Sequence, residues 1–214
     1  MTAEHTPIES PFQFRYSCWF CGEPSATRLL FPHENYVVLA CCHPAISLAS
    51  CLECHHAAKQ STGKNIWQVR SFVKKWLFKS YQKHLAIGLN WTEQELAESQ
   101  FEGGNFESFQ KSAWFMYQVA RDRVNFTGWP IIVNGLDLDY LQTEFDSVFV
   151  FDGVSYPSID EAISHYAGVY DLHKGFFRDV LSKLGTTNFA AAVRFCRLFV
   201  GASPDERKAA LLTL

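Results

Sequence analysis

Two Cys-x-x-Cys pairs, CWFCGEP at residues 18–24 and CLECHHAAK at residues 51–59, decide the fold expected for the N-terminal part of the chain. A Cys-x-x-Cys turn presents two thiolates to one ion with little strain, and zinc favours four such ligands in a tetrahedron. The sequence therefore predicts one Zn²⁺ bound by Cys18, Cys21, Cys51 and Cys54. A closed shell of four cysteines leaves no position for water or substrate, so the metal is expected to stabilise the fold rather than to react.

The residues between and beside the two pairs refine this prediction. Residues 22–50 leave room for a β-hairpin, and the second pair leads toward a helix, so the expected arrangement is a treble clef. The neighbouring Cys41, Cys42 and His43 leave the ligand set open. Either cysteine could replace one of the four, or the three residues could support a second metal. We favour a third interpretation, in which the two cysteines are small buried hydrophobes. Cys196 is expected in a helical core.

Composition and the N-terminal residues restrict the class of protein. With 48% apolar and 19% charged residues, the chain can bury a sizeable core. MTAEHTPIESPF lacks the pattern of a signal peptide, and no stretch approaches 18 uninterrupted apolar residues, so no membrane span is expected. Seven cysteines in such a chain indicate a reducing compartment and metal ligation rather than disulfides. The expected location is the cytoplasm.

Hydrophobic periodicity and turn signals predict an α+β fold that is mostly helical, in two domains. The first, residues 14–127, follows a loose leader and contains strands at 14–20 and 36–42. A helical pattern runs over residues 65–85, and the helix is expected to end at Gly88. The second, residues 146–214, begins with a hairpin turning at Asp152-Gly153 and continues as helices. Three Ser/Thr-x-x-Glu patterns mark helix starts, at Thr92, Ser158 and Ser203.

The net charge of −3 conceals a local excess of positive charge. No acidic residue occurs between Glu53 and Glu93. The same stretch carries Lys59, Lys64, Arg70, Lys74, Lys75, Lys79 and Lys83. Such a block is typical of a surface that neutralises phosphates, and an alternative interpretation is a basic helix packed beside the acidic segment 93–109. The predicted nucleic-acid contacts of this helix are Arg70, Lys74, Lys75, Lys79 and Lys83.

CWFCGEP, then His33, then CLECHHAAK resembles the zinc-bearing form of the HNH nuclease family. The resemblance implies that His33 is a general base and that His55 or His56 holds a catalytic Mg²⁺ or Mn²⁺. Pro32 stands where that family has its acidic metal ligand, and PAISLAS, around Ile46, has no Asn. The side chains that could substitute are Glu34, Asn35 and His56.

A second resemblance lies in the C-terminal third of the chain. GVSYPSIDEA at residues 153–162, followed by Gly168-Val169, is similar to the small DNA-binding modules found beside intron-encoded nucleases. The resemblance implies that residues 173–185 form a helix offered to DNA. Its candidate contacts are His173, Lys174, Arg178 and Lys183.

The sequence thus favours a zinc-binding protein that contacts nucleic acid through its basic helix and C-terminal module, with DNA as the candidate partner. The first alternative is a divalent-metal-dependent nuclease of HNH type. The second is a protein-interaction module that docks a partner through its zinc clasp and aromatic surface, without binding nucleic acid. The sequence leaves the oligomeric state open.

Overall fold

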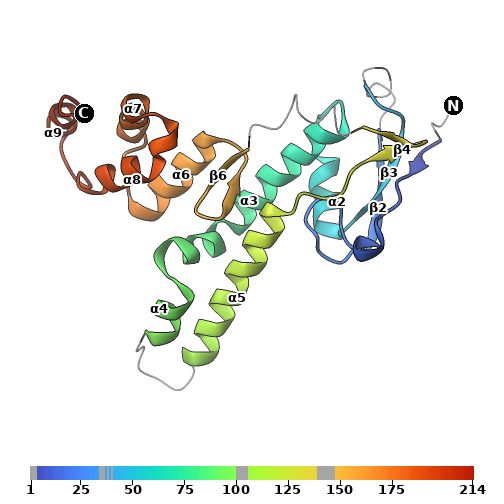
Figure 1. Ribbon diagram of the computed structural model, residues 1–214, viewed down its shortest axis with the longest axis horizontal. Helices are drawn as coiled ribbons and strands as arrows, with labels where there is room; N and C mark the ends of the chain where they lie inside the picture. The colour runs from blue at the N-terminus through green and yellow to red at the C-terminus, as the bar shows by residue number, and fades with distance from the viewer. Residues whose placement is uncertain (1–3, 34–36, 38, 40, 100–105, 139–147) are drawn as a thin grey trace. The chain divides into compact units, whose positions relative to one another are not determined.

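The computed structural model describes residues 4–33, 37, 39, 41–99, 106–138 and 148–214, and Figure 1 shows its helices and strands. Two compact units make up the chain, an N-terminal unit, Met1–Pro157, and a C-terminal unit, Ser158–Leu214. The predicted α+β, mostly helical fold class is confirmed. The described residues contain helices of up to 25 residues, whereas their strands have only two to five residues. In the described part of the chain, no helix combines the length and the apolar character needed to cross a membrane.

A small three-stranded sheet opens the N-terminal unit. Strand β2 (Thr27–Phe31) pairs antiparallel with β3 (Ile46–Ser50), and β1 (Thr6–Pro7) pairs parallel with the other edge of β3. All five residues of β3 are buried. A central strand buried on both faces is expected to be apolar or small, and ISLAS meets that requirement.

Two expectations about this region are wrong. Residues 14–20 do not form a strand: Phe12–Phe14 is a 3-10 turn, and the chain then bends so that the Ser17 backbone pairs with Pro24 across the first cysteine pair. The leader is also not loose throughout, because the backbone N–H groups of Thr6 and Ile8 donate to the carbonyls of Ala45 and Ser47, each at 2.9 Å. Of the expected strand at 36–42, Tyr36, Val38 and Ala40 lie outside the described residues.

Four helices follow the sheet in the N-terminal unit: α2 (Leu52–Lys59), α3 (Ile66–Asn90), α4 (Glu93–Glu98) and α5 (Phe106–Asn125). The capping box predicted at Thr92 is present at the start of α4. Helix α3 begins where the Asn65 side chain accepts from the Gln68 N–H, and it runs antiparallel beside α5, as Figure 1 shows. Its predicted end at Gly88 is wrong, because the helix continues to Asn90.

Gly88 has a different role, which predicts a stability effect. A Cβ added there would lie 2.2 Å from ring atoms of the buried Tyr117 of α5, so the absence of a side chain lets α3 and α5 approach. We expect Gly88→Ala to lower the free energy of unfolding by about 1–3 kcal/mol, because the helices must separate or Tyr117 must move. Denaturant unfolding, followed by circular dichroism, measures this change in the free energy of unfolding.

The matched control is Gly168→Ala in α6 (Ile159–Tyr170), where an added Cβ meets nothing within 4 Å. A helix interior favours Ala over Gly by about 0.5–1 kcal/mol, so this variant should be neutral or more stable. Equal destabilisation of the two variants would contradict the proposed close approach at Gly88.

Two hairpins follow α5 in the N-terminal unit. Strands β4 (Ile132–Val133) and β5 (Leu136–Asp137) form the first, and β6 (Phe149–Phe151) and β7 (Val154–Tyr156) form the second. The turn predicted at Asp152-Gly153 is confirmed, with φ values of 52° and 70°. These left-handed conformations are the ones a two-residue hairpin turn requires.

The structure groups the β6–β7 hairpin with the preceding helices, whereas the sequence grouped it with the following ones. The Asn125 side chain at the end of α5 donates to the Gly153 carbonyl at 2.7 Å and accepts from the Ser155 N–H at 2.8 Å. The Tyr156 ring lies 5.1 Å from that of Phe78 in α3. These contacts make the hairpin part of the N-terminal unit, which extends to Pro157.

The C-terminal unit consists of α6, α7 (Lys174–Leu184), the 3-10 turn η3 (Thr186–Asn188), α8 (Phe189–Arg197) and α9 (Pro204–Leu211). Ser158 and Ser203 cap α6 and α9 as predicted. Phe177 and Phe189, fully buried, lie 5.3 Å apart at the centre of the unit. Cys196 is buried in α8, which confirms its assignment to the core.

Candidate metal centre

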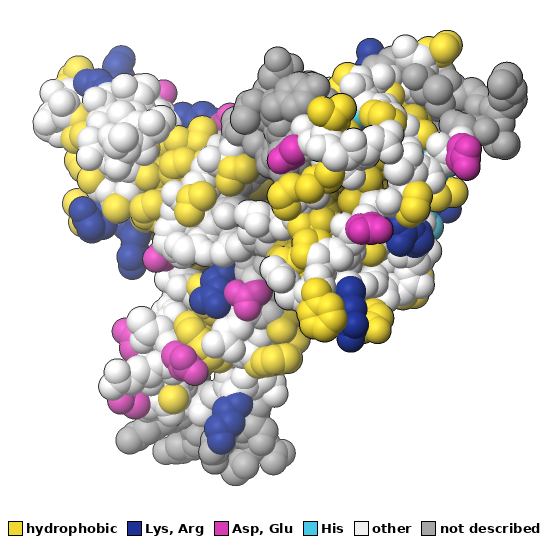
Figure 2. Space-filling view, turned by 45° about the vertical axis from the view of Figure 1, so that its right-hand side comes forward, with side chains coloured by type: hydrophobic (Ala, Val, Ile, Leu, Met, Phe, Trp, Pro, Cys, Tyr) yellow, Lys and Arg dark blue, Asp and Glu magenta, His cyan; other side chains and the backbone are white. Residues whose placement is uncertain are grey.

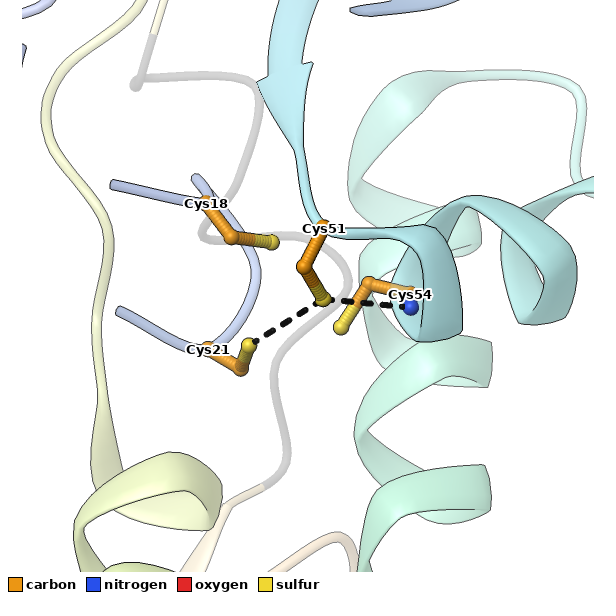
Figure 3. Close-up of side chains that lie close together, drawn as sticks. All are labelled: Cys18, Cys21, Cys51 and Cys54. Atoms are coloured by element: carbon orange, nitrogen blue, oxygen red, sulfur yellow. Dashed lines mark hydrogen bonds between the residues drawn. The ribbon is translucent and has the colours of Figure 1, made fainter. Parts of the chain in front are cut away.

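Three elements of the N-terminal unit bring the four predicted cysteines together. Cys18 and Cys21 lie in the turn between η1 (Phe12–Phe14) and β2, where the Gly22 N–H donates to the Cys18 carbonyl at 2.9 Å. Cys51 follows β3 and is the N-cap residue of α2, and Cys54 lies in the first turn of that helix. Figure 3 shows the four side chains converging.

The spacing of the sulfurs suits a tetrahedral metal ion. All four Sγ atoms lie within 4.8 Å of one another, and those of Cys21 and Cys51 are 3.8 Å apart. A tetrahedron with metal–sulfur bonds of about 2.3 Å separates its ligands by about 3.8 Å. A disulfide would need about 2.05 Å between sulfurs, so the cysteines are free thiols. The cluster can therefore hold a metal ion.

Hydrogen bonds among the four thiols divide them into two pairs: they raise the pKa of Cys21 and Cys54, and they lower the pKa of Cys18 and Cys51 toward the thiolate, the form that binds metals. A hydrogen bond from Cys21 is the main cause that lowers the pKa of Cys18 to about 7. Hydrogen bonds from the other cysteines, that from Cys18 first, hold the pKa of Cys51 below its ordinary value. The Cys51 sulfur also accepts the backbone N–H of Cys54 at 3.4 Å, as the side chain of an N-cap residue does at a helix start.

Arg123, in the last turn of α5, is the partner of this cluster that the sequence did not identify. Its guanidinium donates to the Cys21 sulfur at 3.7 Å, to the Glu53 carboxylate and to the Tyr81 hydroxyl, and lies 4.5 Å from the centre of the Tyr81 ring. Burial opposes the charge on Arg123, yet the bond to Glu53 and the charge of Cys21 keep its pKa above the ordinary value. The sequence pointed to such a partner only through Glu53, a carboxylate between the cysteines of the second pair that required a cation from a distant part of the chain.

Two residues predicted to contact nucleic acid instead turn toward the end of α5. The Lys74 ammonium donates to the carbonyls of Arg123, Val124 and Phe126 at 2.9, 3.1 and 2.6 Å. Arg70 is buried, donates to the Thr127 carbonyl, and lies 4.9 Å from the centre of the Trp19 ring. Burial and then the charge of Arg70 lower the pKa of Lys74 to about 7, while the cysteines act in the opposite direction.

The other predicted contacts are at the surface. Lys75, Lys79 and Lys83 are exposed on α3. In the C-terminal unit, Lys174 and Arg178 are exposed on α7, where Arg178 pairs with Asp160 at 2.9 Å. His173 is the N-cap of α7, and its side chain accepts the Phe176 N–H at 3.1 Å. The predicted DNA contact did not anticipate this structural role.

The histidines of the nuclease hypothesis belong to no cluster of three or more metal-binding side chains in the part of the chain that the structure describes. His33 is exposed after β2, and His56 is exposed in α2 with its Nε2 2.8 Å from the Gln60 amide. Burial, and then the charge of Lys59, lower the pKa of His55. Glu34 and Asn35 lie outside the described residues.

The remaining candidate ligands lie outside the four-cysteine cluster. Cys42 is exposed and Cys41 half-buried, so the expected burial of both is wrong. Of the three residues, His43 is the one that is buried. Its burial is tolerated because both of its ring nitrogens are hydrogen-bonded. Its Nδ1–H donates to the Pro44 carbonyl at 2.8 Å, and its Nε2 accepts the Ile66 N–H, at the start of α3, at 3.0 Å.

No family model matches this chain, and no curated protein or solved structure shows a significant similarity to it.

Proposed function

We propose that the four-cysteine cluster binds a structural Zn²⁺ in a treble clef. The observation behind this proposal is the spacing of the four sulfurs, together with the order of the elements that carry them: a knuckle, an antiparallel strand pair and a helix that begins at the second knuckle. Arg123 donates a hydrogen bond to the Cys21 sulfur, as outer partners of metal ligands commonly do.

We further propose that the protein contacts nucleic acid through the outer face of α3. The observation that carries this proposal is the row of Lys75, Lys79 and Lys83, all exposed and four residues apart. Their spacing corresponds to about 6 Å per step along a helix, so the row is about 12 Å long. One DNA strand presents a phosphate about every 3.4 Å of duplex length, so the row extends over several phosphates.

The positive charge of this proposed interface is confined to the lysine row. On the face that Figure 2 shows, basic and acidic side chains are interspersed among apolar ones, and the net charge is −3. Attraction of a polyanion therefore depends on the lysine row and not on the charge of the whole protein. In the C-terminal unit, Lys174 is a candidate second contact, whereas Asp160 offsets the charge of Arg178.

The test is the salt dependence of DNA binding by Lys79→Gln/Lys83→Gln, measured by fluorescence anisotropy with a labelled duplex. Each lost phosphate contact lowers the slope of log affinity against log salt by about 0.9, so the double variant should lose about 1.8 from its slope. The affinity should fall for all duplex sequences alike, because phosphates carry no sequence information.

The matched control is Arg194→Gln/Lys208→Gln, which removes two exposed positive charges from α8 and α9. It should keep the slope of the unaltered protein. If the α3 variant keeps both slope and affinity, or if the control loses as much, the lysine row is not the interface. Absence of DNA binding together with a co-purifying protein would support the interaction module instead.

A further inference from the structure

A pocket of about 350 Å³ lies in the N-terminal unit between α3, the end of α5 and the β6–β7 hairpin. Figure 1 shows these three elements side by side. Pockets that bind small organic ligands have volumes of about 300–1,000 Å³. The pocket is therefore large enough for a ligand of the size of a nucleotide.

One side of the pocket is cationic. Arg70, Lys74 and Lys75 line it, and among the described residues that line it none is Asp or Glu. Lys74 bonds carbonyls in the last turn of α5 and just after it, and Arg70 bonds the Thr127 carbonyl two residues beyond the helix; the partial negative charge of these carbonyls would otherwise repel an anion. Lys75 is exposed and makes no hydrogen bond or ion pair with the described residues, so its ammonium is available to a ligand.

The β6–β7 hairpin and the residue before it contribute exposed apolar side chains to the pocket. Val148 and Val150, two residues apart and so on the same side of the strand, line it with exposed fractions of 53% and 64%. Asn125 fixes this wall to α5 through its two hydrogen bonds to the hairpin. Exposed apolar side chains facing a cluster of cations match a ligand with an anionic end and an apolar body.

We propose that this pocket binds a small organic phosphate with a flat ring, of which a nucleoside monophosphate is the representative. The phosphate bonds Lys75 beside the charges of Arg70 and Lys74, and the ring lies against Val148 and Val150. Arg70 and Lys75, with the partly protonated Lys74 beside them and no carboxylate among the described lining residues, favour a dianion over a singly charged carboxylate. The proposal shares Lys75 with the proposed nucleic-acid interface but does not rest on that interface, whose other lysines, Lys79 and Lys83, lie outside the pocket one and two turns further along α3.

Isothermal titration of the full-length, metal-containing protein with deoxyadenosine monophosphate tests the proposal, with deoxyadenosine and inorganic phosphate as partial ligands. The monophosphate should bind at least about tenfold more tightly than either part, because each part makes only one set of contacts. Equal affinity for inorganic phosphate would overturn the role of the valine wall, and equal affinity for the nucleoside would overturn the role of the cations.

Two variants locate the site, with circular dichroism to verify their folding. Lys75→Ala and Val150→Asp should each weaken binding by about tenfold or more, whereas Lys79→Ala, one turn along the same helix and outside the pocket, should not change it. Absence of binding by the unaltered protein, or binding that survives both pocket variants, would overturn the proposal. Binding of oligonucleotides without monophosphates would also overturn it, while leaving the interface on α3 standing.

Discussion

Cys54→Ser is expected to release the metal and to unfold the N-terminal unit. Cys54 is fully buried in the first turn of α2, where its thiol lies among the other three. Structural zinc contributes about 10–16 kcal/mol to the folding of small zinc-finger peptides, which is comparable to or larger than the total stability of a typical domain, about 5–15 kcal/mol. Losing one of four ligands removes much of that contribution. Elemental mass spectrometry of the purified protein should show about one zinc per unaltered chain and much less in the variant.

The matched control is Cys42→Ser, because Cys42 is exposed and lies outside the cluster. It should keep its metal and its thermal unfolding temperature. A chelator added to the unaltered protein should reproduce the loss of structure of Cys54→Ser, seen by circular dichroism. If Cys54→Ser retains full metal content and an unchanged unfolding temperature, the cluster does not hold the metal.

The four cysteines could be predicted from the sequence because a Cys-x-x-Cys turn is a local structure. The same holds for the Asp152-Gly153 turn and for the capping residues Thr92 and Ser203, each of which acts within four residues of itself. The strand predicted over 14–20 failed for the opposite reason. Aromatic residues favour a strand there, but the first cysteine pair lies in a turn across which Ser17 pairs with Pro24, so tertiary context prevails over local preference.

The roles of the basic residues could not be predicted, because their partners are distant in the sequence. Residues four apart share a helix face, so Arg70 and Lys74 form one row of α3, and Lys75, Lys79 and Lys83 another. Sequence alone does not show which row is buried. The deciding contacts are the carbonyls of residues 123–127, about fifty residues away, which bond the first row and leave the second to solvent.

Arg123→Ala is expected to lower both stability and metal affinity. Its side chain is 7% exposed and joins the cysteine cluster to Glu53 of α2 and Tyr81 of α3. Removing one partner of a buried ion pair costs about 3–5 kcal/mol, and because Glu53 is 35% exposed and can regain water, we expect about 3 kcal/mol. Losing an outer partner of a metal ligand should weaken metal binding by about 10- to 100-fold.

Arg121→Ala is the matched control, two residues earlier on the same helix. Arg121 also pairs with an acid, Asp122 at 3.0 Å, but both side chains are solvent-accessible, and such a pair contributes about 0–1 kcal/mol. Denaturant unfolding compares the stabilities, and competition with a chromophoric chelator compares the metal affinities.

Arg123→Lys separates charge from geometry, because lysine keeps the charge beside Cys21 and lacks the planar fork that reaches three partners at once. Partial recovery of metal affinity without recovery of stability would assign the metal effect to charge and the stability effect to the fork. Equal behaviour of the alanine variants at 121 and 123 would instead mean that Arg123 supports neither the metal nor the fold.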